Sequence, residues 1–223
     1  MNSSKSQIIK TVVWGASGHA SVVANILQLQ QTFEIAGFID DVNPERQGKF
    51  FCGKKIFGGK EQLPSLRLQN IKHIVLGFGH CSARIKLGEF LLKEGFQLVN
   101  VYHPNATIAN SIEVGQGTVI LAGVVVDPVC QIGDYCIVNN NSTICHNSII
   151  GEGVHICPGV HIGGHVNIGT ASWIGIGSCV ADRVTIGSGS FVGAGSVVVK
   201  DIPDGVLAYG NPARVIRPID RSF

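Results

Sequence analysis

The stretch IGEGVHICPGVHIGGHVNIGTASWIGIGSC, residues 150–179, decides the fold, because Ile recurs in it at every sixth position. The same period runs from Ile108 to the hexad that begins at Val198, sixteen hexads without a slip in register. Position one is Ile or Val in every hexad, and position two is Gly in eight. Position five is Ser, Thr, Val or Cys in all but the two end hexads.

A six-residue period fits neither an amphipathic helix, which needs apolar residues three and four apart, nor a strand of simple alternation. It fits short strands joined by tight corners. We expect the branched residue at position one to point into a narrow interior and glycine to tolerate the corner backbone. A fixed short period predicts a solenoid, in which each coil buries its surface against its neighbours.

These hexads resemble the hexapeptide-repeat acyltransferases. The resemblance implies a left-handed parallel β-helix with three hexads per coil, and a homotrimer that binds acetyl-CoA between adjacent subunits. The closing segment YGNPARVIR, residues 209–217, is similar to the Gly-x-Pro-Ala-Lys/Arg ending of that family. A closed ring of three copies also suits a groove formed between subunits.

Residues 8–103 follow a different pattern, in which β-branched strands alternate with helical segments, as in IIKTVVW, SVVANILQLQ and EIAGFIDD. This alternation predicts a small Rossmann-like α/β domain with a parallel sheet, and we expect two domains, residues 1–104 and 105–223. Ligands of such sheets bind beyond the carboxyl ends of the strands, where GASGH, IDD and GFGH fall. Gly15 and Gly18 form only part of a dinucleotide fingerprint, so a plain strand-to-helix turn is an alternative. Asp40 and Asp41 could bind ribose hydroxyls or form a solvated turn.

WGASGH followed by IDD also resembles the sugar-nucleotide acetyltransferases of the PglD/NeuD type, over nearly the whole chain. The resemblance implies that the front domain holds a UDP-linked 4-amino-deoxy sugar used in surface glycan synthesis. A helix N-terminus can bind the pyrophosphate with its backbone N–H groups. The substrate-binding residues are expected to be Gly15, Ser17, Gly18, His19, Asp40, Asp41 and Gly77.

Acetyl transfer to a sugar ammonium requires removal of a proton, and histidine titrates in the right range. By resemblance His146, in NSTICHN, is the general base; a water-exposed corner histidine is the alternative. Related proteins often follow this histidine with an acid, whereas Asn147 follows it here and brings no charge. The resemblance also assigns acetyl-CoA contacts to His155, Gly164, Ala194 and Arg214.

Composition excludes several other classes of protein. The formal charge is +2 with no basic run, which argues against a nucleic-acid or membrane-surface protein. MNSSKSQ at the N-terminus lacks the apolar core of a signal peptide and is expected to be a short disordered segment. The seven cysteines contain no CxxC pair, which favours the cytoplasm and buried thiols, among them Cys130, Cys136 and Cys179.

A metal site is not expected. It would need three ligands that converge on one point. His155 and His161 occupy the same position of successive hexads, so they should lie on different faces of a coil.

The sequence therefore predicts an acetyl-CoA-dependent N-acetyltransferase of nucleotide-linked amino sugars. Two alternatives remain. One is a NeuD-type sialic acid O-acetyltransferase. The other is a non-catalytic trimeric protein that binds sugar nucleotides, a reading that Asn147 favours.

Overall fold

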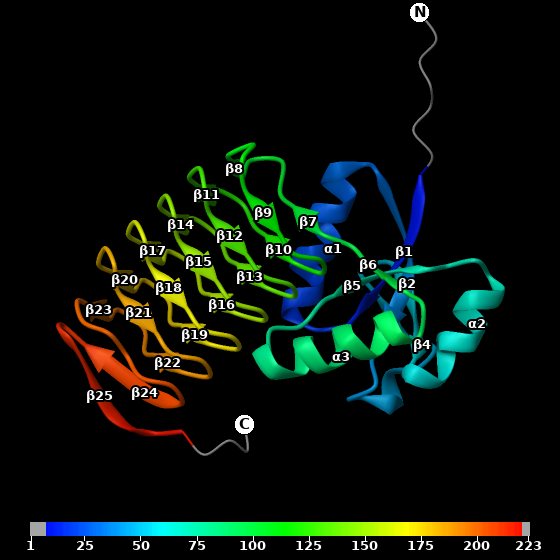
Figure 1. The fold of residues 1–223 in the computed structure, drawn as a ribbon. Coiled ribbons are helices and arrows are strands. Elements are labelled where there is room, and N and C mark those ends of the chain that lie inside the picture. Colours follow the sequence, from blue (N-terminus) through cyan, green and yellow to red (C-terminus); the bar gives the residue numbers. More distant parts are fainter. Residues whose placement is uncertain (1–7, 220–223) are drawn as a thin grey trace, which may run out of the picture. The chain divides into compact units, whose positions relative to one another are not determined.

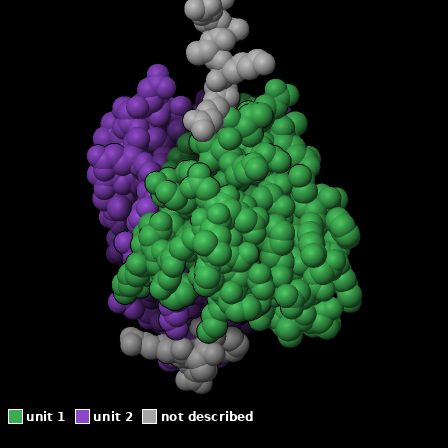
Figure 2. Space-filling view, turned by 90° about the vertical axis from the view of Figure 1, so that its right-hand side faces the viewer, with its two compact units in different colours: residues 1–78, 88–104 green, residues 79–87, 105–223 purple. Residues whose placement is uncertain are grey.

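The protein is described by a computed structural model in which residues 8–219 are placed (Figure 1). The expected N-terminal segment, residues 1–7, lies outside the described residues. Contacts divide the chain into two compact units (Figure 2). Within the described residues, unit 1 comprises 8–78 and 88–104, and unit 2 comprises 79–87 and 105–219. The units differ from the predicted domains in one segment, residues 79–87, which groups with the second unit.

Unit 1 is built on a sheet of strand order β3-β4-β2-β1-β5-β6. All neighbouring strands are parallel except β3, which pairs with β4 in an antiparallel hairpin. The strands are β1 (Ile9–Trp14), β2 (Phe33–Ile39), β3 (Phe50–Phe51), β4 (Lys54–Gly58), β5 (His73–Leu76) and β6 (Gln97–Leu98), followed by β7 (Val101–Tyr102). The helices are α1 (Gly18–Gln30) and α2 (Leu63–Leu68), with the 3₁₀ turns η1 (Pro44–Arg46) and η2 (Lys60–Gln62). Helix α3 (Cys81–Lys93) is divided, with residues 81–87 in unit 2 and 88–93 in unit 1. The predicted α/β architecture is confirmed.

The centre of this sheet is fully buried. Val12 and Val13 of β1, Phe38 of β2, and Ile74 and Val75 of β5 expose none of their surface. Parallel strands covered on both faces show such continuous apolar runs rather than alternation. Burial of these side chains holds the strands in place. The predicted nucleotide-binding residues directly follow the carboxyl ends of these strands.

Unit 2 is a left-handed parallel β-helix, as predicted. Each strand pairs with the strand eighteen residues away, as when Ile156 faces Ile174, so one coil contains three hexads. Figure 1 shows the coils stacked in chain order from β8 to β23. The coil strands are β8 (Thr107–Ile108), β9 (Glu113–Val114), β10 (Val119–Ile120), β11 (Val125–Val126), β12 (Gln131–Ile132), β13 (Ile137–Val138), β14 (Thr143–Ile144), β15 (Ile149–Ile150), β16 (His155–Ile156), β17 (His161–Ile162), β18 (Asn167–Ile168), β19 (Trp173–Ile174), β20 (Cys179–Val180), β21 (Thr185–Ile186), β22 (Phe191–Val192) and β23 (Val197–Val198). An antiparallel hairpin of β24 (Val206–Gly210) and β25 (Ala213–Pro218) follows.

The interior of the β-helix matches the hexad pattern. Every position-one residue from Ile120 to Val198 is buried, whereas Ile108 and Val114, at the open end, are half-buried. Position five also points inward, and its small side chains satisfy backbone groups. Ser148, for example, donates to the carbonyl of Gly163 at 3.0 Å and accepts from the amide of Val166 at 3.1 Å. The small residue therefore fits the narrow corner without leaving a buried polar group unsatisfied.

The glycine expectation needs correction. The left-handed backbone lies at position four of the hexads from 117 to 195, where several residues are not glycine, including Val129 and Tyr135. Position-two glycines have no such φ; they leave room for the next coil. A Cβ at Gly151 would lie 2.7 Å from the amide nitrogen of Thr170. Contact between coils, rather than a left-handed φ, excludes side chains at those corners.

Two of the three thiols expected to be buried lie in the interior. Cys130 and Cys136 occupy position five, and burial raises the pKa of the Cys136 thiol to about 12. The expectation for Cys179 is wrong, because its side chain is exposed. Cys179 is at position six of its hexad, which points away from the interior. No helix within residues 8–219 has both the length and the apolar character required to cross a membrane.

The segment 79–87 contributes a buried cation to unit 2. Arg84 of α3 is fully buried and donates to the carbonyls of Tyr135 at 2.6 Å and Gly117 at 2.8 Å. These carbonyls belong to position-four residues of neighbouring coils. Desolvation lowers the pKa of Arg84 to about 10, so the guanidinium stays charged at neutral pH. Arg84 thus attaches the start of α3 to the β-helix by charge-assisted hydrogen bonds.

Candidate active site

His146 lies at the corner between β14 and β15, and its side chain is exposed. Its Nδ1 is 3.0 Å from Oδ1 of Asn147. Because an amide oxygen only accepts hydrogen bonds, Nδ1 carries a hydrogen, and in the neutral form of the ring the lone pair is then on Nε2. Nε2 has no protein partner within residues 8–219. The corner therefore presents Nε2 as the ring nitrogen that can accept a proton from a substrate.

Gly164, one coil further, forms the surface on which this ring rests. A Cβ at residue 164 would lie 2.9 Å from Cε1 and 3.0 Å from Nε2 of His146. The amide of Gly164 donates to Oδ1 of Asp182 at 2.8 Å, one coil further still. This amide, predicted to contact acetyl-CoA, is thus already engaged with a carboxylate. Its cofactor role stays a prediction, while the packing under His146 explains why glycine occupies the position.

Sequence reasoning missed His165 as a site residue. Its ring contacts that of His146 edge-to-face, with centroids 5.3 Å apart at 88°. Its amide donates to the carbonyl of His146 at 3.0 Å. His165 follows Gly164 and has a φ of 58°, which side chains rarely adopt. Counting eighteen residues from Asn147 would have revealed it, since stacked corners bring residues one coil apart together.

His155 is in a different environment. It is only 6% exposed and packs on the ring of Trp173, with centroids 4.1 Å apart. Its Nδ1 donates to the carbonyl of Gly79 at 3.0 Å, and in the described part of the chain its buried Nε2 has no partner. Burial lowers the pKa of His155 to about 4, which the bond to Gly79 partly offsets. If His155 contacts acetyl-CoA as predicted, it does so as a neutral and buried imidazole ring.

The remaining predicted cofactor residues lie elsewhere on unit 2. Ala194 is at the corner between β22 and β23, whereas Gly164 is at the corner between β17 and β18. The corner of Ala194 follows a strand of the sheet that contains β22, whereas the corner of Gly164 follows a strand of the sheet that contains β17. Arg214 lies on the exposed strand β25. One chain thus places Gly164 and Ala194 on different corners of the coil.

In unit 1 the predicted nucleotide turn is tightly built. Gly15 has a φ of 115°, and a Cβ there would lie 2.8 Å from the carbonyl oxygen of Gly77. The amide of Gly77 in turn donates to the carbonyl of Trp14 at 2.7 Å. The turn that follows β1 therefore needs glycine both for its conformation and for the approach of the turn that follows β5. This geometry supports a structural requirement for Gly15 in addition to any ligand contact.

The start of α1 has the features of an anion-binding helix end. Ser17, at the N-cap, is exposed and makes no side-chain capping bond. Gly18 opens the helix, and a Cβ there would meet nothing within 4 Å. His19 lies in the first turn. Backbone N–H groups at such an end, without a side-chain cap, can bind a phosphate oxygen.

The two aspartates after β2 differ from each other. Asp40 is 5% exposed, and its oxygens accept bonds from the amide and side chain of Asn43 and from Arg46. Asp41 is exposed and accepts one bond, from the indole nitrogen of Trp14 to Oδ1 at 3.0 Å. Asp41 therefore keeps an oxygen for a ligand, whereas the carboxylate of Asp40 is occupied by its own loop.

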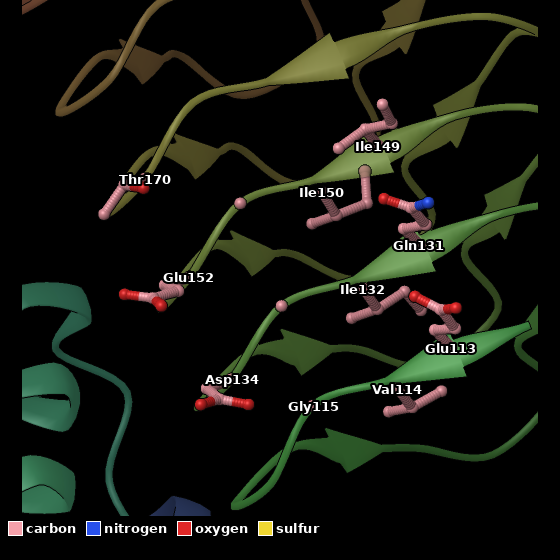
Figure 3. Close-up of a pocket in the computed structure, with 12 residues that line it drawn as sticks. Glu113, Val114, Gly115, Gln131, Ile132, Asp134, Ile149, Ile150, Glu152 and Thr170 are labelled. Atoms are coloured by element: carbon pink, nitrogen blue, oxygen red, sulfur yellow. The ribbon is translucent and has the colours of Figure 1, made fainter.

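A hollow of about 650 Å³ lies on the face of unit 2 formed by β9, β12 and β15. Its polar lining comes from Glu113, Gln131, Asp134, Glu152 and Thr170 (Figure 3). None of the residues predicted for catalysis or binding lines it. Among the described residues no cluster of three His, Cys, Asp or Glu side chains could hold a metal ion.

Two family models match the chain: the PglD N-terminal domain over residues 10–91, and the bacterial transferase hexapeptide (six repeats) over residues 129–164. No curated protein sequence matches it.

Solved structures match almost the whole chain. PerB from Caulobacter crescentus, in complex with CoA and GDP-perosamine, is 35% identical, with a TM-score of 0.88 over 95% of this chain and 99% of that one. The acetyltransferase domain of PglB from Neisseria gonorrhoeae, in complex with acetyl coenzyme A, is 37% identical, with a TM-score of 0.88 over 94% and 100%. WeeI from Acinetobacter baumannii is 26% identical, with a TM-score of 0.68 over 94% and 100%.

A β-helix of hexads that carries an exposed histidine at one corner, preceded by a small α/β unit, defines an acyltransferase of the hexapeptide-repeat class. The α/β unit and the near-complete coverage of PerB and PglB narrow this class. The chain belongs to the PglD family of sugar acetyltransferases.

Proposed function

We propose that this protein transfers the acetyl group of acetyl-CoA to the amine of a nucleotide-linked amino sugar. The observation that carries the proposal is the exposed ring of His146, which Asn147 holds through Nδ1 so that Nε2 is left without a partner among residues 8–219. Nε2 takes a proton from the sugar amine as the nitrogen attacks the thioester carbonyl. The C–S bond then breaks, CoA leaves as a thiolate, and the amide product retains the acetyl group.

Asn147 supports this role without a negative charge. Its oxygen orients the ring and accepts the Nδ1 hydrogen, as an acid would, but does not stabilise the imidazolium by charge. His146→Ala should lower kcat by ~10²-fold or more, the usual range for loss of a general base. The KM for acetyl-CoA should barely change, since the ring meets the amine. A near-normal kcat in this variant would refute the base assignment.

The nucleotide is the finer part of the proposal. The sequence predicts a UDP-linked 4-amino-deoxy sugar, whereas the solved structure of PerB holds GDP-perosamine. The decisive experiment is CoA release from acetyl-CoA with UDP- and GDP-linked amino sugars and with free sialic acid. Turnover only with an amino-sugar nucleotide supports the proposal, and the nucleotide that is turned over identifies the nucleobase of the substrate. Turnover only with sialic acid would support O-acetylation, and binding without turnover would support a non-catalytic role.

We also propose a cytoplasmic homotrimer with acetyl-CoA bound between subunits. Support comes from the two predicted cofactor residues that lie on different corners, Gly164 and Ala194. A cofactor that runs along one groove could contact Gly164 of one copy and Ala194 of its neighbour. Analytical ultracentrifugation should give three times the chain mass of 23.6 kDa. A monomer that retains full activity would contradict this arrangement.

A further inference from the structure

The predicted nucleotide edge of unit 1 raises an electrostatic problem. Asp40 and Asp41 are adjacent at the end of β2, and together they place two negative charges where a diphosphate is proposed to bind. Glu61, bonded to the amide of Gly59, adds a third at the end of β4. Carboxylates close to a diphosphate weaken its binding unless a cation offsets them. The structure supplies such a cation at one position.

Arg46, the last residue of η1, forms an ion pair with Asp40, with Nη1 3.1 Å from Oδ2. The Asp40 side chain is 5% exposed and the Arg46 side chain 28% exposed, so the pair is only partly screened by water. No other cation in the described part of the chain forms an ion pair with either aspartate. The negative charge of Asp40 is therefore offset by Arg46, whereas the negative charge of Asp41 is not offset by an ion pair.

Arg46 also connects the two loops of the predicted site. The same Nη1 donates to the carbonyl of Ala16, inside the turn that follows β1. The guanidinium carbon lies 5.5 Å from the centroid of the Phe51 ring, which holds the side chain from a second direction. Its Nε and Nη2 donate to no residue between 8 and 219. The cation is thus fixed beside the turn proposed to bind phosphate, with donor groups to spare.

We propose that Arg46 makes this edge able to accept a nucleoside diphosphate by offsetting the charge of Asp40. The inference rests on the proposed function, because it assumes that the sugar nucleotide binds at this edge. It assigns Arg46 as a positioning residue and changes the predicted role of Asp40 from ligand to partner of Arg46. Asp41 remains the acidic residue that is free to contact the ligand.

The test uses calorimetric titration of the whole protein with UDP and with GDP, at low and at moderate salt. Arg46→Gln removes the cation and should weaken binding ~10-fold or more, with a smaller effect in salt. Arg46→Lys keeps the positive charge on a single donor atom, as both bonds of Arg46 come from Nη1 alone, and should stay within about 3-fold of the native protein. Asp40→Asn should bind as tightly as the native protein or more tightly.

The double variant D40N/R46Q separates charge from scaffolding. If charge balance is the role, it should bind within about 3-fold of the native protein, because the uncompensated carboxylate is gone. If Arg46 only holds the loops together, the double variant should bind as weakly as Arg46→Gln. That result, or native-like binding by Arg46→Gln, would overturn the inference.

Circular dichroism melting identifies any variant that fails to fold. Should Arg46→Gln unfold because it leaves Asp40 buried and unpaired, the double variant still decides the question. Failure of the native protein to bind either nucleotide would instead refute the proposed function.

Discussion

Burial of His155 predicts a stability that falls in mild acid. Burial lowers its pKa from 6.5 to about 4 in the folded protein, so between these values the unfolded chain binds a proton that the folded protein excludes. The free energy of unfolding therefore rises with pH in this window: the contribution is present above pH 6.5 and is lost as the pH falls toward 4. At pH 5.5 the loss relative to pH 7 should be about 1 kcal/mol, and at pH 4.5 about 2 kcal/mol.

Urea unfolding of the native protein and of His155→Gln, followed by circular dichroism at pH 7, 5.5 and 4.5, measures this loss. Glutamine can still donate to the carbonyl of Gly79 but does not titrate. Other acid-sensitive groups are shared, so the difference in pH dependence isolates His155. His161→Gln is the matched control, because His161 occupies the same position of the next hexad and is exposed. Equal pH slopes for the native protein and His155→Gln would refute the argument.

Three further predictions concern the site and the coil. Gly164→Ala should lower kcat ~10- to 100-fold with little change in melting temperature, because its Cβ would lie 2.9 Å from the exposed His146 ring and displace it. In steady-state assays the double variant G164A/H146A should have the same kcat as His146→Ala alone, and additive losses of kcat would contradict the contact. Ile162→Asp should unfold the β-helix, seen as loss of the cooperative melt, because an unpaired carboxylate in the coil interior costs several kcal/mol, roughly; unchanged melting would show that Ile162 is not inward. Asp41→Ala should raise KM for the sugar nucleotide more than KM for acetyl-CoA, and an equal rise in both would place Asp41 outside the nucleotide site.

The hexads predicted the fold of unit 2 well because one requirement, burial in the interior of a narrow coil, determines the residue at position one. Ile162 and Ile168 point inward as their register requires. The reason for the position-two glycines was less accessible, since it depends on how closely Thr170 approaches Gly151. The exposure of Cys179 follows from register alone, which places it at position six rather than five.

The site was harder to predict, because its contacts join residues distant in sequence. His146 and Asn147 are neighbours, so their hydrogen bond could be anticipated. The hydrogen bond of buried His155 goes to a carbonyl 76 residues earlier in the chain, which no local pattern reveals. Arg46 lies in a polar turn with no motif, and only the folded loops bring it to Asp40 and Ala16.

The coil of eighteen residues also limits how this protein can change in length. Inserting six residues between His146 and Gly164 would keep every position-one Ile and Val inside, yet would advance all later residues by one corner. Gly164 and Asp182 would then leave the column that supports the His146 ring, while the fold itself survived. Only whole coils can be gained or lost there in phase with the catalytic corner, so length variants that keep activity should differ by multiples of eighteen.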